Sequence, residues 1–300
     1  MASVFCIGVA VQDFIYFVDE MPRAAKKYRA RDFVTVGGGC AATAAVAVAR
    51  LGGDVRLAAR LGDDLLAGLI VSELESYGVD CTYLLRFAGR RSPLSSIFID
   101  AAGERLIMGF RDKMMPATDD RLPDPLPPDV DAVLVDTRWI QGGVDMMRRA
   151  EAAEKPRILD GEPPFKDCEE LIALSTHIIF SAHGLQELSG VQDFAEGMTR
   201  ISAMTGAWLA VTDGANGIYY LDDGQMIHVS VPQVEVVDTL GAGDTWHGAF
   251  ALALAEGRPE VEAIAFANVA ASLKCTRRGG RAGVPDRAAV DAYMMEHPSS

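Results

Sequence analysis

The sequence predicts an α/β protein in which a doubly wound sheet is flanked by helices and a second, smaller β layer projects from it. Three observations lead to this fold class. From about residue 123 onward, short β-rich runs alternate with helical segments, as in repeated strand–helix–strand units. A glycine-rich turn stands before an apolar helix near the C-terminus, and ligands bind at such turns in these folds. Two early hairpins do not fit the alternation, so we expect them to form the separate layer.

The N-terminal part of the chain supplies the first strand and the first hairpin. Residues 4–11 form a short apolar run that predicts a buried strand, and Asp13 follows it. Residues 14–18 and 28–36 alternate apolar and polar residues, which predicts a hairpin with one solvated face. Three further elements have glycine or polar stop signals: a helix over 41–51, a strand over 55–60 and a helix over 64–77.

The remaining elements complete the two layers. Residues 95–100 and 104–110 predict a second hairpin, after which a proline-rich linker over 116–128 returns the chain to the large sheet. Later strands are predicted at 132–136, 157–160, 177–181, 208–212 and 217–221. The small layer is therefore assigned residues 14–36 and 94–112, and the α/β domain residues 1–13, 37–93 and 113–300.

Composition excludes several classes of partner. The 300 residues are 49% hydrophobic and 23% charged, which is typical of a globular protein. The net charge of −14 repels a phosphate backbone, so nucleic acid is not expected as a partner. Five scattered cysteines without a C-x-x-C pair favour a reduced, cytoplasmic protein without zinc. We expect no signal peptide and no membrane partner, because neither a basic n-region nor a long apolar run is present.

The turn Asp238-Thr239-Leu240-Gly241-Ala242-Gly243-Asp244 is the strongest candidate for catalysis. Gly241, Ala242 and Gly243 leave their backbone N–H groups unscreened, and the helix predicted from residue 246 directs its positive end at them. Such a turn binds an anion and stabilises a phosphoryl group during transfer. Asp244 lies at its mouth, where it can accept a proton from an attacking hydroxyl. The turn therefore predicts a kinase.

A second glycine-rich segment, Gly37-Gly38-Gly39-Cys40-Ala41-Ala42, satisfies the dinucleotide pattern G-x-G-x-x-A. It follows a hairpin strand rather than the opening strand of the sheet. In addition, no acidic residue ends a strand about 20 residues later, where the ribose ligand belongs. A dinucleotide-dependent oxidoreductase is therefore a disfavoured alternative.

The pattern D-T-x-G-A-G-D, followed by Gly248-Ala249-Phe250, resembles the C-terminal signature of the ribokinase family, also called the PfkB carbohydrate kinases. The resemblance implies a ribokinase-like fold in which Asp244 is the catalytic base and Gly241–Gly243 form the anion hole. It further implies a small-molecule sugar and ATP as ligands, with Mg²⁺. The small layer becomes a lid over the sugar and a homodimer interface. Such kinases commonly hold a monovalent cation near the catalytic turn, whose ligands the sequence leaves unassigned.

The same resemblance implies the other binding residues. Asp13 accepts sugar hydroxyls, Gly38 and Gly39 let the sugar approach the backbone, and Thr43 stands where the family usually has Asn. The segment Val211-Thr212-Asp213-Gly214 resembles the family's nucleotide loop. The implied ATP-binding residues are Thr212, Gly214, Gly217, Asn268, Ser272 and Gly280.

One family motif is missing. The N-x-x-E motif associated with magnesium should follow residues 178–180, but the chain has Ser181-Ala182-His183-Gly184. The metal ligands therefore remain unknown, and Mg²⁺ is expected to be held mainly by ATP oxygens and water. Acids such as Asp160, Glu162 and Glu187 are the available additions.

Residues 36–47 and 273–286, with Asp136-Thr137-Arg138-Trp139 and Asp160-Gly161, are similar to the sulfofructose kinase branch of the family. That branch phosphorylates the C1 hydroxyl of 6-deoxy-6-sulfofructose, whose sulfonate requires fixed cations. Arg138, Lys27 and Arg111 are the candidates. Residues 108–111 depart from the branch, so a phosphosugar or neutral-sugar kinase of the same fold remains an alternative. A catalytically silent sugar-binding regulator is a further alternative, raised by the missing acid.

Overall fold

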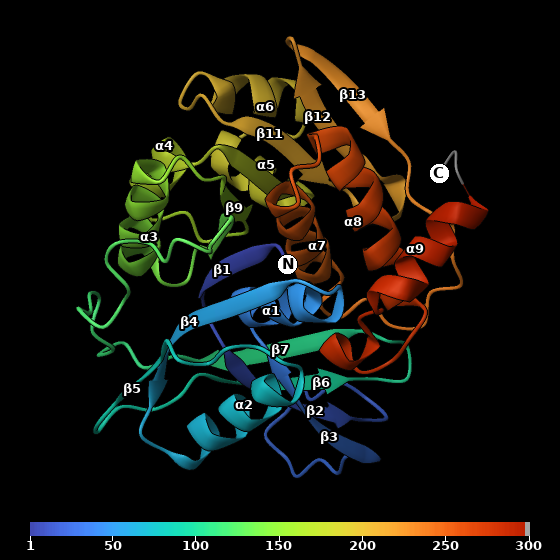
Figure 1. The fold of residues 1–300 in the computed structure, drawn as a ribbon. Coiled ribbons are helices and arrows are strands. Elements are labelled where there is room, and N and C mark those ends of the chain that lie inside the picture. Colours follow the sequence, from blue (N-terminus) through green and yellow to red (C-terminus); the bar gives the residue numbers. More distant parts are fainter. Residues whose placement is uncertain (298–300) are drawn as a thin grey trace.

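The computed structural model describes residues 1–297, and its centre is a nine-stranded sheet covered by helices on both faces (Figure 1). From one edge to the other, its strands are β13 (Gln225–Val229), β12 (Ile218–Asp222), β11 (Trp208–Thr212), β10 (His177–Ser181), β9 (Arg157–Gly161), β8 (Ala132–Asp136), β1 (Ser3–Gly8), β4 (Asp54–Gly62) and β5 (Leu84–Phe87). All neighbours from β11 to β5 are parallel, whereas β12 and β13 are antiparallel additions at the edge. The sheet is therefore mixed.

Two layers of helices bury the two faces of this sheet. One layer is made of α1 (Cys40–Arg50), α2 (Leu65–Ser76), α7 (Ala242–Ala255), α8 (Glu260–Cys275) and α9 (Arg287–Glu296). The other is made of α3 (Ile140–Ala152), α4 (Glu169–Leu174), α5 (Ala182–Ser189) and α6 (Phe194–Ser202). Because both faces are covered, the central strands are apolar throughout rather than alternating. Within residues 1–297, no helix is both long enough and apolar enough to cross a membrane.

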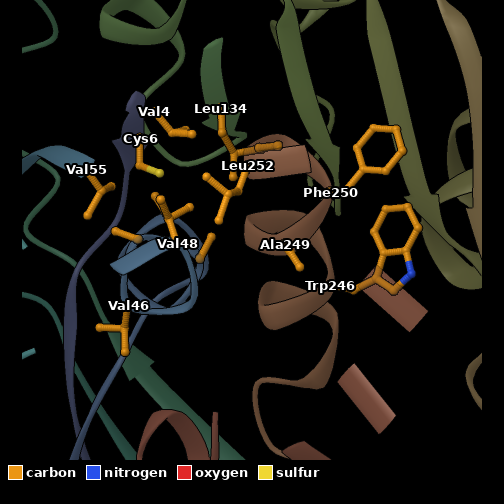
Figure 2. Close-up of a cluster of buried hydrophobic side chains, with 14 of the residues drawn as sticks. Val4, Cys6, Val46, Val48, Val55, Leu134, Trp246, Ala249, Phe250 and Leu252 are labelled. Atoms are coloured by element: carbon orange, nitrogen blue, oxygen red, sulfur yellow. The ribbon is translucent and has the colours of Figure 1, made fainter. Parts of the chain in front are cut away.

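Helices α1 and α7 pack against each other over β1, and this contact determines where the site forms. Figure 2 shows Val48 of α1 beside Leu252 of α7, whereas Val46 points away from α7. The approach is close because small residues meet, and a Cβ added at Gly248 would overlap the backbone of Ala44. The N-terminal ends of both helices are thereby brought to the same edge of the sheet.

A separate four-stranded sheet confirms the predicted small β layer. Its order is β3 (Asp32–Gly38), β2 (Val11–Phe17), β6 (Leu94–Ile99) and β7 (Arg105–Phe110). Helix α2 packs against β2 and β3, beside the large domain (Figure 1). One face of this sheet carries the buried side chains of Ile15 and Ile97. The opposite face carries a row of aromatic rings from Phe14, Tyr16, Phe33 and Phe98.

The structure corrects several predicted element boundaries. β1 ends at Gly8, and after two residues the chain enters the small sheet as β2. β3 begins at Asp32 rather than at residue 28, and the edge strands β5 and β13 were not predicted. Helix α7 begins at Ala242 rather than at Trp246, because Gly241 adopts a left-handed conformation (φ 75°) and accepts the Thr245 N–H. Gly243 and Asp244 therefore belong to the first turn of the helix.

Candidate active site

The site forms where the C-terminal ends of β1, β8 and β9 meet the N-terminal ends of α1 and α7. The carboxylate of Asp136, at the end of β8, joins three segments that are distant in sequence. It accepts the backbone N–H groups of Val9 at 2.9 Å, Ala41 at 3.1 Å and Arg138 at 2.8 Å. A side chain at Gly8 would overlap this carboxylate, so only glycine fits beside it. The Asp136 carboxylate thus holds these three segments together at the base of the site.

Asp244 lies at the centre of this edge, in the first turn of α7. Its carboxylate accepts a hydrogen bond from the thiol of Cys40, at the start of α1. Ligand-type atoms of Cys40, Asp160 and Asp244 all lie within 4.8 Å of one another. Burial, followed by the negative charge of Asp160, raises the pKa of Asp244 to about 7. A carboxylate with such a pKa is suited to proton transfer near neutral pH.

The backbone amides of the turn differ in their availability. Ala242 donates its N–H to the carbonyl of Thr239 at 3.2 Å, so its amide is engaged within the turn, unlike the free donor that the sequence predicts. Within residues 1–297, the N–H groups of Gly241, Gly243 and Asp244 have no recorded backbone or side-chain acceptor. These three free amides and the N-terminal end of α7 form a candidate anion hole.

His247, one turn further along α7, was not identified from the sequence. Its Nδ1 lies 2.8 Å from the carbonyl oxygen of Gly243, and its Nε2 lies 3.2 Å from that of Ile179. Two carbonyl acceptors require both ring nitrogens to carry hydrogen, which is the imidazolium form. Burial alone lowers the pKa of His247, but the Asp160 carboxylate 3.5 Å away and the two carbonyls raise it above its ordinary value. The cation balances Asp160 and opposes the rise in the pKa of Asp244.

The predicted sugar residues converge on the same edge. Asp13 is buried in β2, and a Cβ at Gly38 would overlap its carboxylate. Burial raises the pKa of Asp13, while a hydrogen bond from Ser95 and the charge of Arg281 oppose the rise. Gly39 is the N-cap of α1 with φ 97°. Thr43 is buried in α1, and a Cβ at Gly241 would lie 3.2 Å from its methyl group, so Thr43 touches the catalytic turn.

Arg281, in the short helix η2 (Gly280–Gly283), is a second residue that sequence reasoning missed. Its side chain is only 1% exposed, and its Nη2 donates to the carbonyl of Gly38 at 2.6 Å. Nη1 lies 3.7 Å from Glu73, whereas Nε and Nη1 have no hydrogen-bond partner. The guanidinium therefore helps to fix the backbone of Gly38, on the sugar side of the site. In the sequence, Arg281 is marked only by its place in the segment 273–286, which is similar to the sulfofructose kinase branch.

A cavity of about 270 Å³ opens beside the catalytic turn and is a candidate nucleotide site. Of the predicted ATP residues, Thr212, Gly214, Asn268 and Ser272 line it, together with Gly243 and Trp246. The Asn268 side chain is already engaged, because its oxygen accepts from Trp246 Nε1 at 2.8 Å and its nitrogen donates to Ser230 at 3.1 Å. It therefore shapes the wall rather than offering a free polar group.

Gly217 and Gly280 do not line this cavity, in contrast to the prediction. Gly217 has φ 107°, and a side chain there would overlap the carbonyl of Val229, so its role is in the turn before β12. Gly280 donates its N–H to Asp238 at 3.2 Å and lines a different hollow under the small sheet.

Two of the three predicted cations, Arg138 and Arg111, act on each other electrostatically. The side chain of Arg138 donates to the Thr137 hydroxyl at 3.0 Å, and within residues 1–297 no carboxylate lies within 4 Å of it. Arg111 directly follows β7, and its side chain has no hydrogen bond or ion pair to the described residues. Desolvation and the positive charge of Arg138 both lower the pKa of Arg111. The Asp136 carboxylate opposes part of this shift, and it also interacts with Arg138. Two guanidiniums that repel each other favour an anion between them.

Lys27 is not part of this group. It is exposed in the connection between β2 and β3, at the end of the small sheet that is marked by the pair Phe17–Asp32. Arg111 follows the opposite end, and five residues of strand separate the two ends by about 17 Å. A single chain therefore does not place Lys27 beside Arg111 and Arg138.

The described residues do not assemble a magnesium site of their own. In the cluster of Cys40, Asp160 and Asp244, burial holds the pKa of the thiol well above its ordinary value, so it stays protonated. A thiol is in any case a poor ligand for Mg²⁺, and Asp160 is already paired with His247. His183, at the place of the missing acid, is exposed and lies 3.6 Å from Glu187.

Comparisons with known proteins agree with this architecture. The sequence model for the pfkB family carbohydrate kinases matches residues 1–287. A ribokinase of Bacillus subtilis is 30% identical over 297 residues, covering 98% of this chain and 100% of the relative. A fructokinase of Klebsiella pneumoniae is 30% identical over 279 residues, covering 83% of this chain and 88% of the relative.

Solved structures show the same fold. A candidate ribokinase of Agrobacterium tumefaciens superposes with a TM-score of 0.91 at 36% identity, covering 100% of this chain and 99% of that one. An Arabidopsis thaliana ribokinase, solved with ribose and ATP, superposes with a TM-score of 0.80 at 23% identity over 97% of each chain. The ribokinase-like α/β fold predicted from the sequence is thereby confirmed.

Proposed function

Because the chain belongs to the pfkB family of carbohydrate kinases, we propose that it transfers a phosphoryl group from ATP to the C1 hydroxyl of an anionic ketose, foremost 6-deoxy-6-sulfofructose. An ATP-dependent carbohydrate kinase follows from the family. The anionic substrate is the part of the proposal that family membership alone does not establish. The alternative is a neutral-sugar kinase, since the relatives include ribokinases and fructokinases.

In the proposed mechanism, Asp244 accepts the proton of the C1 hydroxyl while the hydroxyl oxygen attacks the γ-phosphorus. The bond to the oxygen that bridges the β- and γ-phosphates breaks, and ADP leaves with the electron pair. The free amides of Gly241, Gly243 and Asp244 face the transferring group and stabilise its charge. A pKa of about 7 leaves a useful fraction of Asp244 ionised under neutral conditions.

We propose that ATP occupies the cavity beside the turn, since Gly243 and Trp246 line it next to the free amides. We expect ATP to arrive as its magnesium complex, with the metal carried by phosphate oxygens and water. Asp13, Gly38, Gly39 and Thr43 are proposed to hold the sugar on the other side of the turn. The small sheet is proposed to act as a lid that excludes water from the transfer.

The observation that carries the anionic substrate is the pair of guanidiniums of Arg138 and Arg111. Neither has a carboxylate within ion-pair distance in residues 1–297, and their charges act on each other. The protein is acidic as a whole, with a net charge of −14, so two unpaired cations at one rim are a local exception. A sulfonate or a phosphate at the far end of a ketose satisfies both through several charge-assisted hydrogen bonds.

The test is steady-state kinetics of ADP release with 6-deoxy-6-sulfofructose, fructose 6-phosphate, fructose and ribose. The wild type should prefer an anionic ketose. Arg138→Ala should raise KM for it by about tenfold or more and leave KM for fructose nearly unchanged, because a charged hydrogen bond is lost only with the anion. Arg148→Ala is the control, since Arg148 pairs with Glu170 on the outer surface of α3 and α4.

Three outcomes contradict the proposal. Equal effects of Arg138→Ala on the anionic and neutral sugars would remove the anion clamp. A preference for ribose or fructose would establish the neutral-sugar alternative. Absence of ADP release with every sugar would favour the silent sugar-binding regulator.

We also propose that the chain forms a homodimer through the small sheet. The face that carries the aromatic row also exposes Phe33, Leu106 and Met108, which are 46%, 41% and 66% exposed. Apolar surface of this kind is typical of a protein interface.

The cysteines are free thiols in the structure, which fits the cytoplasmic location that we propose.

A further inference from the structure

Lys274, in the last turn of α8, has a completely buried side chain directly beneath the catalytic turn. Its Nζ donates to the backbone carbonyl of Asp238 at 2.7 Å and lies 3.8 Å from Asp238 Oδ2. Its side chain is 0% exposed, and a buried ammonium is costly unless the protein uses it. The mechanism described above gives this cation no role.

Burial lowers the pKa of Lys274 overall, and the negative groups around its ammonium offset part of that effect. The carbonyl of Cys275 at the end of α8 accepts the N–H groups of Val237 and Asp238, so the negative end of this helix faces the turn. Burial alone raises the pKa of Asp238, but hydrogen bonds from Leu240, Gly279 and Gly280 and the charge of Lys274 together lower it. A carbonyl and an ionised carboxylate at one point are the ligands that a partly dehydrated alkali cation takes.

The oxygens of Asp238 have little remaining capacity to bind a cation from solution. Asp238 Oδ1 accepts the N–H of Leu240 at 2.9 Å, and Oδ2 accepts those of Gly279 at 3.0 Å and Gly280 at 3.2 Å. Arg105, from lid strand β7, lies 3.7 Å from Oδ1 and also donates to the Thr239 hydroxyl at 3.3 Å. Asp238 is thus surrounded by donors and cations of the protein itself. The monovalent cation that the family resemblance implies does not fit at this carboxylate.

We infer that the Lys274 ammonium is a built-in monovalent cation for the catalytic turn, so that turnover needs neither K⁺ nor Na⁺. Lys274 is a positioning residue, because it touches Asp238 and not the reacting atoms. By holding the carbonyl of Asp238, it fixes the first residue of the turn whose amides at Gly241, Gly243 and Asp244 face the phosphoryl group. The inference rests on kinase activity alone, and therefore holds or fails separately from the anionic substrate.

The first test uses the wild-type enzyme with whichever sugar it phosphorylates fastest. Initial rates are compared in K⁺, Na⁺ and tetramethylammonium salts at constant ionic strength, with Mg²⁺ and ATP saturating. The expected result is the same rate in all three, within about twofold. Activation by K⁺ or Na⁺ of about tenfold or more over tetramethylammonium would overturn the inference.

The second test asks whether a free cation can replace the missing ammonium. Lys274→Met keeps the length of the side chain and removes its charge, and it should lose about tenfold or more in kcat/KM when tetramethylammonium is the only monovalent cation. K⁺ or NH₄⁺ should then restore part of the rate and raise Tm of this variant, while leaving the wild-type Tm unchanged.

Lys155→Met is the matched control, because it removes an ammonium that pairs with Asp131 at 3.3 Å near the start of β8. It should show no cation dependence. A folded Lys274→Met enzyme that keeps wild-type kcat/KM in tetramethylammonium would overturn the inference. If Lys274→Met does not fold, the wild-type comparison still decides.

Discussion

At the scale of single residues, the chemistry depends on how the environment of Asp244 sets its charge. The carboxylate lies among Asp160, Cys40 and His247, and their effects oppose one another. Burial and the Asp160 charge favour the protonated acid, whereas the His247 cation and the Cys40 thiol favour the anion. The balance falls near neutral pH, where a base is most effective.

Asp244 should therefore produce an acidic limb in the pH profile. Because its pKa is raised, the carboxylate is protonated below about pH 7 and ionised above it. Hence kcat/KM should fall as the pH drops through that value and level off above it. Asp244→Asn should lower kcat by about a thousandfold, as expected for loss of a general base, and abolish the limb. Activity near wild type in this variant would remove the catalytic assignment.

His247→Asn tests the cation beside this base. Since the positive charge of His247 lowers the pKa of Asp244, its removal should shift the acidic limb to higher pH. Rates measured well above the limb should change much less than rates measured below it. A profile that keeps its wild-type midpoint would show that His247 does not set the charge of Asp244.

The sequence predicted the part of the site whose residues are adjacent in the chain. The turn 238–244 contains both its glycines and its base, so one motif identified them together. His247 stands three residues later, but its role could not be predicted, because its partner Asp160 comes from β9, which is distant in the sequence. Arg281 and Lys274 resemble surface cations in the sequence, and only the fold shows that they are buried. Lys27 is the reverse case, a lysine that the fold leaves exposed and that a single chain does not place beside Arg111 and Arg138.

At the scale of elements, the close contact of α1 and α7 brings Thr43 next to Gly241. This contact uses Gly248, whose absent side chain leaves room for the backbone of Ala44. The two helices therefore position the sugar side and the phosphoryl side of the site relative to each other.

Gly248→Ala should consequently destabilise the protein. A methyl group forced against the carbonyl of Ala44 costs about 1–3 kcal/mol of unfolding free energy by overpacking. Gly68→Ala is the control: Gly68 lies on the exposed side of α2 with open space around it, and alanine should gain about 0.5–1 kcal/mol there. Urea unfolding of the two variants measures both changes. Equal stability of the two variants would contradict the packing argument.

The fold was predictable wherever an element carried its own periodicity or stop signal. The helix at 41–51 and the strands at 132–136 and 208–212 were located nearly correctly because glycine, proline or a buried apolar run delimits them. β5 and β13 were not predicted, because each is an edge strand whose few residues lack a distinctive pattern. The antiparallel direction of β12 depends on its partner β11, which periodicity does not report.

At the scale of the whole molecule, the exposed face of the small sheet should determine the oligomeric state. Met108→Asp places a charge on that face, and it should convert the proposed dimer into a monomer because an unpaired charge opposes burial. Met204→Asp is the control, since Met204 is 55% exposed at the other side of the fold, after α6. Size-exclusion chromatography with light scattering measures the mass. A wild type that is monomeric at micromolar concentration would contradict the proposal.

The position of β1 in the sheet has a consequence for synthesis of the chain. β1 pairs with β4 on one side and with β8 on the other. A ribosome adding about 5–20 residues per second leaves the second edge of β1 bare for several seconds before residues 132–136 emerge. During that interval an apolar strand with unpaired amides is available to other nascent chains. The yield of enzyme in a cell is therefore expected to depend on a chaperone that masks residues 3–8 until translation has passed the middle of the message.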